Sequence, residues 1–514
     1  MTTLYKKRLR MVAGMLAIGS LLTLNACQDH RLSPDPATVP DATVFALNDA
    51  NQLVRLNIRN TNAPLATTTI TGPGLMSGER IMSIDFRPAT GQLYGVSNMS
   101  RLFVINTATA VARAIGSAPF TPAVTGSVVA LDFNQTVDRI RLVTNTGQDL
   151  RLNPETGTVA AVDGTINGAQ GATISAVAYT NNRAGATTTT LYDIDPATDR
   201  LYIQNPPNNG TLIDVGPLGL DITGAAGFDI SPNDNSQGLV AVTFNGSSEL
   251  QQINLSTGRL QKLGNLPGTI IGLAIPTEPV AYALDGSGNL LIFNPLSPSP
   301  VAKAITGVQP GETLFGIDFR PVNGQLYAIG STSRLYTLNT SNGAATLVGS
   351  GPLSTLLVGN DVGFDFNPTV DRIRLVTSSG QNLRLNPETG AVAMVDGPLN
   401  PGTPTVTASA YTNNFAGAAT TTLYNIETSM STARLFTQTP PNDGTLVPVG
   451  SLGVTAEGAN GFDIGGTSGM AYALLRSNGT TVLYTVNLTN GSATAAGTLP
   501  GNPIVRGFAL GLGF

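Results

Sequence analysis

The sequence predicts an all-β protein made of tandem β-propellers, and three observations support this prediction. Charged residues make up only 11% of the chain and glycine occurs 58 times, which is typical of a β protein with many tight turns. The 23 residues from Asp138 to Ala160 return from Asp371 to Ala393 with 19 identities, so the chain is internally duplicated. Within each half, a unit with four β-type runs recurs at spacings of 44 to 52 residues, which is the period of a propeller blade.

The chain begins with a segment that is typical of an export signal. Basic residues lie between Lys6 and Arg10, and the run of 14 apolar residues that follows is too short to cross a bilayer as a helix. The run leads into "LNAC", which resembles the lipobox of bacterial lipoproteins and ends at Cys27. We therefore expect residues 1–26 to be a lipoprotein signal peptide and Cys27 to be lipidated. Ordinary secretion with an unmodified Cys27 is the alternative.

Residues 27–42 are rich in proline and polar residues, so we expect a flexible tether there. Removal of residues 1–26 deletes four basic and no acidic residues, which takes the net charge from −5 to −9. An acidic chain without a basic run predicts no nucleic acid partner. The expected partner is the membrane, reached through the lipid. The expected location is the cell envelope, at its periplasmic or outer-membrane face.

The duplication predicts two propeller repeat domains, over residues 43–276 and 279–514. A four-stranded sheet has two apolar faces, and both are covered only when another sheet lies on each side. One apolar strand in each unit carries a recurring position that marks the blade. These positions are Asp85, Asp132, Tyr179, Asp229, Ala274, Asp318, Asp365, Tyr411, Asp463 and Ala509.

The strand order at the chain ends predicts how the rings close. The first two strand-like runs precede any marked strand, whereas Arg506–Phe514 is a marked strand with nothing after it. Ile270–Pro276 and Val280–Phe293 repeat this arrangement in mid-chain. Pairing each last strand with the first strand of its own half gives two five-bladed rings of four-stranded blades. A single ten-bladed ring is the alternative, because the joint "PTEP" between the halves is short.

Two repeated motifs resemble the uncharacterised bacterial domain-of-unknown-function family 4394. They are the phrase "DRIRLVT..GQ.LRLNPETG" and the segment "AYTNN", which occurs at Ala178–Asn182 and Ala410–Asn414. Both halves carry both motifs, so the resemblance covers about nine-tenths of the chain. It implies a propeller-like β domain, often in an exported protein. It implies no established activity and no catalytic residue.

Six of the ten marked positions are aspartates, and two interpretations are open for them. An aspartate before a turn accepts backbone N–H bonds and sets the hairpin, which is the preferred interpretation. Alternatively, three carboxylates per ring converge near the central channel and hold Ca²⁺ or Mg²⁺. Apart from this possible Ca²⁺, we expect no cofactor. The candidates for a ligand or ion site are Asp85, Asp132, Asp229, Asp318, Asp365 and Asp463.

Six arginines lie within predicted strands, where a guanidinium group needs a partner. Ion pairs within the fold are the preferred interpretation, with Asp138, Asp149 and Glu155 as candidate partners. A site for an anion or a carboxylate ligand is the alternative, because arginine suits bidentate recognition. The arginines are Arg139, Arg141, Arg151, Arg372, Arg374 and Arg384.

The residue types available limit the possible activities. The only histidine is His30 and the only cysteine is Cys27, so the domains contain no Ser–His–Asp or Cys–His arrangement and no histidine-ligated metal. Paired carboxylates are the one familiar catalytic option that remains. We therefore expect a non-enzymatic binding or scaffold module whose ligand is a protein, a glycan or a small polar molecule. The alternatives are a carboxylate-dependent polysaccharide hydrolase and a Ca²⁺-stabilised structural surface protein.

Overall fold

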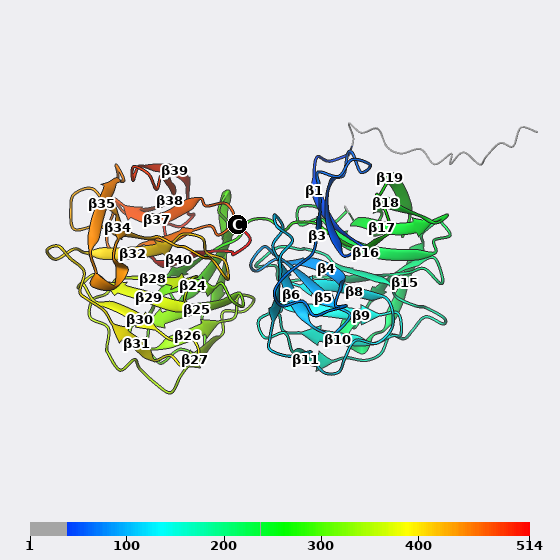
Figure 1. Cartoon of the computed structure of the whole chain (residues 1–514), viewed down its shortest axis with the longest axis horizontal. Coiled ribbons are helices and arrows are strands. Elements are labelled where there is room, and N and C mark those ends of the chain that lie inside the picture. The colour runs from blue at the N-terminus through cyan, green and yellow to red at the C-terminus, as the bar shows by residue number, and fades with distance from the viewer. Residues whose placement is uncertain (1–38, 237) are drawn as a thin grey trace, which may run out of the picture.

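The computed structural model describes residues 39–236 and 238–514. The predicted signal peptide, Cys27 and the tether up to residue 38 lie outside these residues. The described chain forms ten four-stranded antiparallel sheets in two groups of five. We call these groups the N-terminal unit and the C-terminal unit, and Figure 1 shows them side by side. Among the described residues, no helix is long and apolar enough to cross a membrane.

The N-terminal unit is built from the first half of the duplication. Its strands are β1 (Thr43–Asn48), β2 (Gln52–Asn57), β3 (Ala66–Thr69), β4 (Ile81–Arg87), β5 (Gln92–Ser97), β6 (Leu102–Ile105), β7 (Ala112–Ile115), β8 (Val129–Asn134), β9 (Arg139–Thr144), β10 (Asp149–Leu152), β11 (Val159–Val162), β12 (Ala176–Tyr179), β13 (Leu191–Asp195), β14 (Arg200–Gln204), β15 (Leu212–Pro217), β16 (Gly224–Ile230), β17 (Gly238–Phe244), β18 (Ser247–Ile253), β19 (Leu260–Asn265) and β20 (Ile270–Ala274). One 3₁₀ turn, η1 (Pro207–Asn209), precedes β15.

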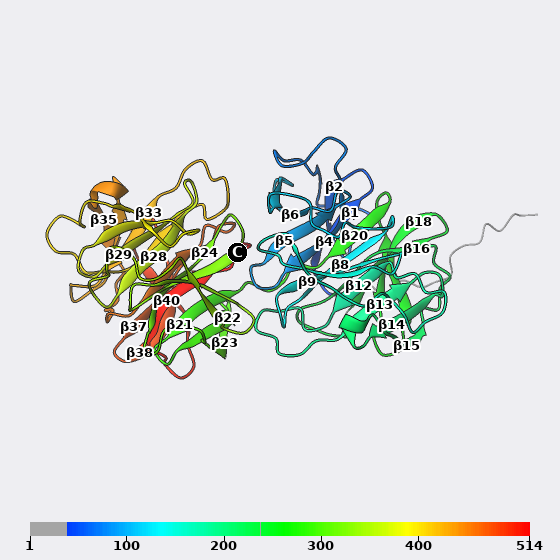
Figure 2. The same ribbon diagram turned by 90° about the horizontal axis from the view of Figure 1, so that it is seen from below.

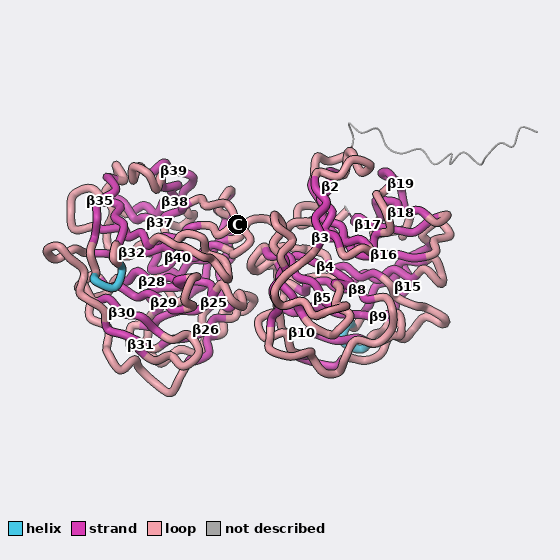
Figure 3. Tube along the Cα trace, in the orientation of Figure 1, coloured by secondary structure: helices cyan, strands magenta, loops and turns pink. Residues whose placement is uncertain are grey.

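The C-terminal unit repeats this arrangement. Its strands are β21 (Ala281–Asp285), β22 (Asn289–Asn294), β23 (Ser297–Ala304), β24 (Leu314–Arg320), β25 (Gln325–Gly330), β26 (Leu335–Leu338), β27 (Ala345–Val348), β28 (Val362–Asn367), β29 (Arg372–Thr377), β30 (Asn382–Leu385), β31 (Val392–Val395), β32 (Val406–Tyr411), β33 (Leu423–Glu427), β34 (Arg434–Gln438), β35 (Leu446–Ser451), β36 (Gly461–Ile464), β37 (Ala471–Ser477), β38 (Thr480–Val486), β39 (Ala493–Thr498) and β40 (Val505–Leu510). The turn η2 (Pro441–Asp443) is the counterpart of η1, and Figure 3 shows short helical turns among the strands.

One edge strand of each sheet lies beside the corresponding edge strands of its neighbours. We call these the inner strands. In the N-terminal unit they follow one another in the order β4, β8, β12, β16 and β20, and β20 lies next to β4 again. In the C-terminal unit the same cyclic order joins β24, β28, β32, β36 and β40. All ten marked positions lie in inner strands, as the sequence period predicted.

Each half of the chain pairs its last strand with its first. In the N-terminal unit, β20 pairs with β1, and Phe45 lies opposite Ala274. In the C-terminal unit, β40 pairs with β21, and Ala281 lies opposite Leu510. Figure 2 shows β40, in red, beside β21. The ten sheets therefore divide into two groups of five, and the alternative of one series of ten sheets is wrong.

The core consists of apolar side chains held between neighbouring sheets. Tyr94 on β5 contacts Phe133 on β8 edge-on, with ring centroids 5.2 Å apart. The equivalent pair, Tyr327 and Phe366, has the same separation. Such rings each bury about 150–250 Å² and dominate the packing energy of a core. The repeated aromatic pair thus joins the same two sheets in each unit.

Candidate binding and metal sites

Three aspartates from three inner strands meet in each unit. Asp85, Asp132 and Asp229 each place a carboxylate oxygen within 4.8 Å of the other two, and we call them the N-terminal triad. The C-terminal triad has the same geometry. It consists of Asp318, Asp365 and Asp463. All six side chains are at most 1% exposed.

Each of two triad members bridges neighbouring strands with its two oxygens. Asp85 accepts the N–H of Phe86 on its own strand at 2.7 Å and that of Phe133 on β8 at 2.8 Å. Asp229 accepts the N–H of Ile230 and that of Ile275, just after β20, each at 2.6 Å. The preferred interpretation from sequence placed such bonds in the following hairpin. The structure places them across the gap between sheets.

The C-terminal triad makes the same bridges. Asp318 accepts the N–H groups of Phe319 and Phe366 at 2.7 Å. Asp463 accepts those of Ile464 and Leu510 at 2.6 Å. The aspartates therefore bond the backbone and converge on one another at the same time, so the two interpretations from sequence are not exclusive.

The third member of the N-terminal triad is only half satisfied. Asp132 Oδ1 accepts the N–H of Tyr179 at 2.9 Å, but its buried Oδ2 has no hydrogen-bond partner. The amide of Asn182, which is 0% exposed, donates from Nδ2 to Asp229 Oδ1 at 3.2 Å. Its Oδ1 also has no partner, and the same is true of Asn414 Oδ1 in the C-terminal unit. Buried polar atoms without partners are rare in folded proteins, so these oxygens call for an explanation.

Burial raises the pKa of every triad carboxyl. It raises the pKa of Asp229 and of Asp463 to about 7. The pKa of Asp85 and that of Asp132 lie well above the usual range, because burial raises them first and the neighbouring carboxylates add to this effect. No described Lys, Arg or His forms a salt bridge with a triad. The triads therefore favour a species that offsets their negative charge.

A small hollow lies among the inner strands of the N-terminal unit. It is about 10 Å³ in volume, and residues of β4, β8, β12, β16 and β20 line it. Ile84 and Leu131 lie on its wall, each one residue before a triad aspartate. Ser175 also lines it, and its buried Oγ has no partner. This volume is close to that of one water-sized sphere.

The predicted strand arginines are bonded to groups within the chain. Arg141, at 1% exposure, donates to Asp149 at 2.6 Å, to Asp163 at 2.5 Å and to Asn208 at 2.7 Å. Arg151 binds Asp163 through both oxygens, at 2.7 and 2.9 Å. In the C-terminal unit, Arg374 and Arg384 both bind Asp396 in the same manner. Arg139 and Arg372 donate to the carbonyl oxygens of the residues before them.

Two of the partners expected from sequence belong to a different arginine. Asp138 forms a bidentate pair with Arg87, in which Arg87 Nε donates at 2.9 Å. Glu155 accepts from Arg87 Nη2 at 2.9 Å. The expectation that Asp138 and Glu155 pair with the strand arginines of their own sheet is therefore wrong. Arg87 reaches them from the neighbouring sheet. In the C-terminal unit its repeat counterpart, Arg320, binds Asp371 in the same way.

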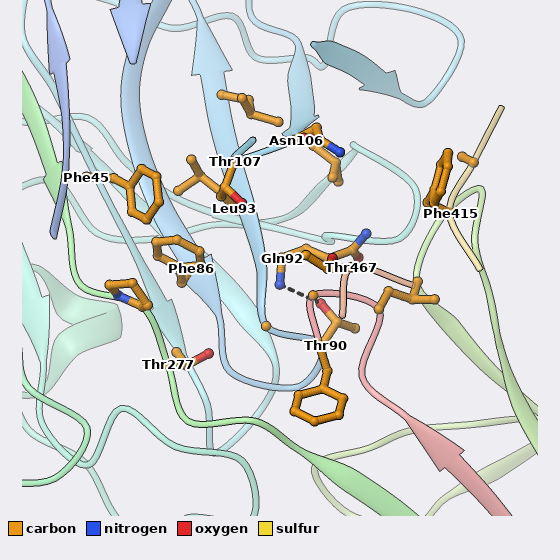
Figure 4. A pocket seen from close by; sticks show the side chains of 18 of the residues that line it. Phe45, Phe86, Thr90, Gln92, Leu93, Asn106, Thr107, Thr277, Phe415 and Thr467 are labelled. Carbon is orange, nitrogen blue, oxygen red and sulfur yellow. Dashed lines mark hydrogen bonds between the residues drawn. The ribbon is translucent and has the colours of Figure 1, made fainter. Parts of the chain in front are cut away.

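A pocket of about 520 Å³ lies between the two units, and we call it the inter-unit pocket. Phe45, Phe86 and Leu93 of the N-terminal unit and Phe415 and Phe514 of the C-terminal unit line it. Figure 4 shows Phe45 next to Phe86 on one wall and Phe415 on the opposite side. Pockets of 300–1,000 Å³ with aromatic walls and a few polar groups are typical of small-molecule sites.

Two polar atoms in the wall of this pocket lack partners. Gln92 Oε1 and Thr277 Oγ1 are buried and make no hydrogen bond. Gln92 lies on β5 and Thr277 lies in the joint between the units. A buried polar atom without a partner costs about 1–3 kcal/mol of stability. Among the described residues, Glu278 is the only Asp or Glu in the lining.

The contacts beside the pocket hold the two units together. Tyr282 OH donates to the carbonyl oxygen of Ala89 at 2.9 Å, and Gly513 N donates to that of Thr90 at 2.7 Å. Arg113 donates to the carbonyl oxygens of Pro321 and Val322. These bonds fix the walls of the pocket relative to each other.

Comparison with known families assigns the repeat. The profile of the Domain of unknown function (DUF4394) matches residues 52–274 and again residues 289–509. The chain belongs to the DUF4394 family. Two DUF4394 copies in tandem therefore correspond to the two units, and the resemblance found from the repeated motifs is confirmed. No curated protein sequence matches the chain significantly.

Two of the solved structures that match this DUF4394 protein are only weakly similar to it. The extracellular domain of a hybrid two-component system from B. thetaiotaomicron is 10% identical, with 89% of this chain and 72% of that chain covered and a TM-score of 0.27. A protein from Lactobacillus plantarum is 16% identical, with 63% of this chain and 95% of that chain covered, also with a TM-score of 0.27. Likeness of this degree carries no argument about the DUF4394 fold or function.

Several site residues were not predicted from the sequence, although some of them lie in short phrases that both copies share. Arg87 and Arg320 both occur in the phrase "IDFRP", and Asp163 and Asp396 both occur in "VDG". A search of the DUF4394 copies for every shared charged residue would have found both pairs. Gln92 also recurs, as Gln325 in the shared phrase "GQLY", but the repeat does not indicate the pocket or Thr277, because this site forms only where two different copies meet.

Proposed function

We propose that the protein is an exported, lipid-anchored binding module of the cell envelope. In this proposal it consists of two closed five-bladed propellers and is not an enzyme. Its ligand is a small hydroxyl-rich molecule with an apolar face, such as a short saccharide. The ligand lies in the inter-unit pocket.

The cyclic order of the inner strands supports closed propellers. β20 lies beside β4 and also pairs with β1, so the first and last strands of the N-terminal copy share one sheet. In the C-terminal copy, β40 likewise lies beside β24 and pairs with β21. A ring of this kind leaves no inner strand without a neighbour, which covers both faces of every sheet.

The sequence around Cys27 supports the lipid anchor. A basic segment, a short apolar run and "LNAC" precede the polar residues up to Val39, which is buried in the N-terminal unit. We expect the wild-type protein in the membrane fraction and the Cys27→Ser variant in the soluble fraction, as measured by fractionation and immunoblotting. A wild-type protein that is soluble throughout would contradict the anchor.

The inter-unit pocket is the observation that carries the binding function. Its aromatic walls suit the C–H faces of a sugar ring, and the side chains of Gln92 and Thr277 in its lining are of types that hydrogen-bond hydroxyl groups. Its volume of about 520 Å³ is suitable for a ligand made of a few sugar rings. The hydrolase alternative has less support, because glycosidases need two accessible carboxylates about 5–9.5 Å apart. Glu278 stands alone in the pocket, and the triads are buried.

Binding of neutral saccharides tests this proposal. Full-length protein is titrated by calorimetry with a panel of di- to tetrasaccharides, and at least one is expected to bind. Thr277→Val removes the hydroxyl at constant volume. Phe415→Arg installs the residue that the first copy has at position 183. Each change should weaken binding about five- to tenfold, since one lost hydrogen bond or aromatic contact costs about 1–1.5 kcal/mol.

Leu356→Arg is the matched control, because Leu356 is 61% exposed and does not line the pocket. It should bind as the wild type does. Failure of the whole panel to bind would contradict the saccharide class. Equal binding by the wild type and both pocket variants would contradict the pocket as the site. Release of shorter saccharides by the wild type would favour the hydrolase.

A further inference from the structure

The two aspartate triads do not line the inter-unit pocket, so ligand binding there does not explain them. We propose that each triad binds one divalent metal cation, with Ca²⁺ as the preferred ion, so that one chain holds two. This inference does not depend on the saccharide proposal. It rests on the spacing of the oxygens, their charge, and the oxygens nearby that lack partners.

The spacing of the carboxylate oxygens suits Ca²⁺. Ca²⁺ binds oxygen at 2.3–2.6 Å, so two of its ligands lie at most about 5 Å apart. The three oxygens of each triad lie within 4.8 Å of one another. Mg²⁺ binds at 2.0–2.1 Å, which limits its ligands to about 4.2 Å and demands an octahedron. Ca²⁺ accommodates every separation up to this bound, whereas Mg²⁺ accommodates only those up to about 4.2 Å.

The charge of the triads also calls for a cation. Three carboxylates at most 1% exposed lie together in each unit, and their hydrogen bonds come from backbone N–H groups and, at Asp229, from the amide of Asn182. No arginine or lysine among the described residues offsets them. Buried charges of one sign are strongly unfavourable unless they are paired or coordinate a metal.

An independent observation is the set of buried oxygens without partners next to the triads. Asn182 reaches the N-terminal triad, since its Nδ2 bonds Asp229, and its own Oδ1 is unpaired at 0% exposure. Asn414, its repeat counterpart, is 2% exposed and also has an unpaired Oδ1. Amide and carboxylate oxygens are the donors that Ca²⁺ prefers. The unpaired Asp132 Oδ2 is a further free ligand atom.

The three carboxylates do not complete the coordination shell of Ca²⁺ on their own. Ca²⁺ takes six to eight oxygens, so protein oxygens and a water can complete the shell together. Both copies contain three equivalent aspartates and an equivalent asparagine with an unpaired oxygen, Asn182 or Asn414, which predicts two similar sites.

Calorimetric titration of the metal-free protein tests the proposal. Full-length protein is treated with EDTA, dialysed, and titrated at pH 7.5 with CaCl₂ and separately with MgCl₂. We expect two equivalents of Ca²⁺, with a Kd between about 10⁻⁷ and 10⁻⁴ M, and at least tenfold weaker Mg²⁺ binding. Ca²⁺ should also raise the melting temperature, because it binds only the folded chain.

Asp132→Asn and Asp365→Asn assign the sites. Each asparagine can still accept the N–H of Tyr179 or Tyr411, which the aspartate accepts at 2.9 or 3.0 Å, but it lacks the charge. Each single variant should bind one equivalent of Ca²⁺ fewer than the wild type, and the double variant should bind none. Asp49→Asn, on an exposed residue, is the control and should keep both.

The proposal is overturned if the wild type binds no Ca²⁺ and Ca²⁺ does not change its melting temperature. The triad carboxylates would then be neutralised by protonation and not by a metal ion. Binding that persists in the double variant would equally overturn the proposal, as would Mg²⁺ binding as tight as that of Ca²⁺. If a variant does not fold, anomalous diffraction from wild-type crystals soaked in Ca²⁺ decides. Peaks at both triads support the proposal, and their absence contradicts it.

Discussion

At the scale of single residues, the most unusual group outside the triads is Asp193. It is 0% exposed on β13, and neither of its carboxylate oxygens has a hydrogen-bond partner. Burial raises its pKa well above the usual range, and Asp149 raises it further. The second copy has Asn425 at the equivalent position, where Nδ2 donates to Gln438 Oε1 at 2.9 Å. Gln204, the counterpart of Gln438, has an unpaired Oε1.

Asp193→Asn is therefore expected to stabilise the protein. The new amide can donate to Gln204 Oε1, which satisfies two buried groups at once. We expect a gain of about 1–3 kcal/mol in the free energy of unfolding at pH 7.5, since this is the cost of a buried polar group without a partner. The gain should shrink as the pH falls. Because the folded-state pKa of Asp193 is raised above its unfolded value of about 3.9, protonation on acidification relieves the wild-type penalty.

Urea unfolding at pH 7.5 and pH 5 measures this effect. The reciprocal change, Asn425→Asp, is the control, and it should destabilise the second copy at pH 7.5 more than at pH 5. A loss of stability in Asp193→Asn at pH 7.5 would contradict the argument, because it would mean that the ionised carboxylate has a favourable partner.

The sequence predicted the positions of the triads but not all the partners of the charged residues. The repeat period alone placed Asp85, Asp132 and Asp229 at equivalent points of the inner strands, and the structure brings their carboxylate oxygens within 4.8 Å of one another. Partners such as Asp163 depend on side-chain direction across a sheet, which sequence spacing does not contain. The pairing of Arg87 with Asp138 also crosses from one sheet to the next.

At the scale of strands, prediction succeeded because each strand is a short apolar run between turn residues. The ten inner strands and the pairing of β40 with β21 followed from counting strands at the chain ends. The bridging carboxylates add a link that packing alone does not give. Asp85 and Asp229 each bond a backbone N–H of the neighbouring inner strand or of the residue just after it. These directional bonds fix how far one sheet can slide along the next, whereas apolar contacts alone do not.

At the scale of the whole molecule, the arrangement of the two units could not be predicted. The network of Arg87, Asp138 and Glu155 has a full copy in the second unit, yet the side chain of Glu155 is 15% exposed and that of its counterpart, Glu388, is 71% exposed. The C-terminal unit covers only the first network. Gly324 accepts a hydrogen bond from Arg87 at 3.1 Å. Because the residues of both networks are the same, their sequence cannot indicate which one is covered.

The contact between the units depends on a close backbone approach at Gly513. A Cβ atom there would lie 2.1 Å from the carbonyl oxygen of Gly91, which is much closer than any real contact. Arg113 adds side-chain bonds to the carbonyl oxygens of Pro321 and Val322. Both residues act on the contact between units, and each unit has its own apolar core.

We therefore expect the double variant Gly513→Ala/Arg113→Ala to separate the units while both remain folded. Small-angle scattering should show a larger radius of gyration, and the joint at Pro276–Pro279 should be cleaved faster by protease, because the bonds that shield it are lost. Gly351→Ala is the control, since a Cβ at Gly351 meets open space. Separation should also abolish saccharide binding, because the walls of the inter-unit pocket come from both units. A scattering curve identical to that of the wild type would mean that other contacts hold the units together.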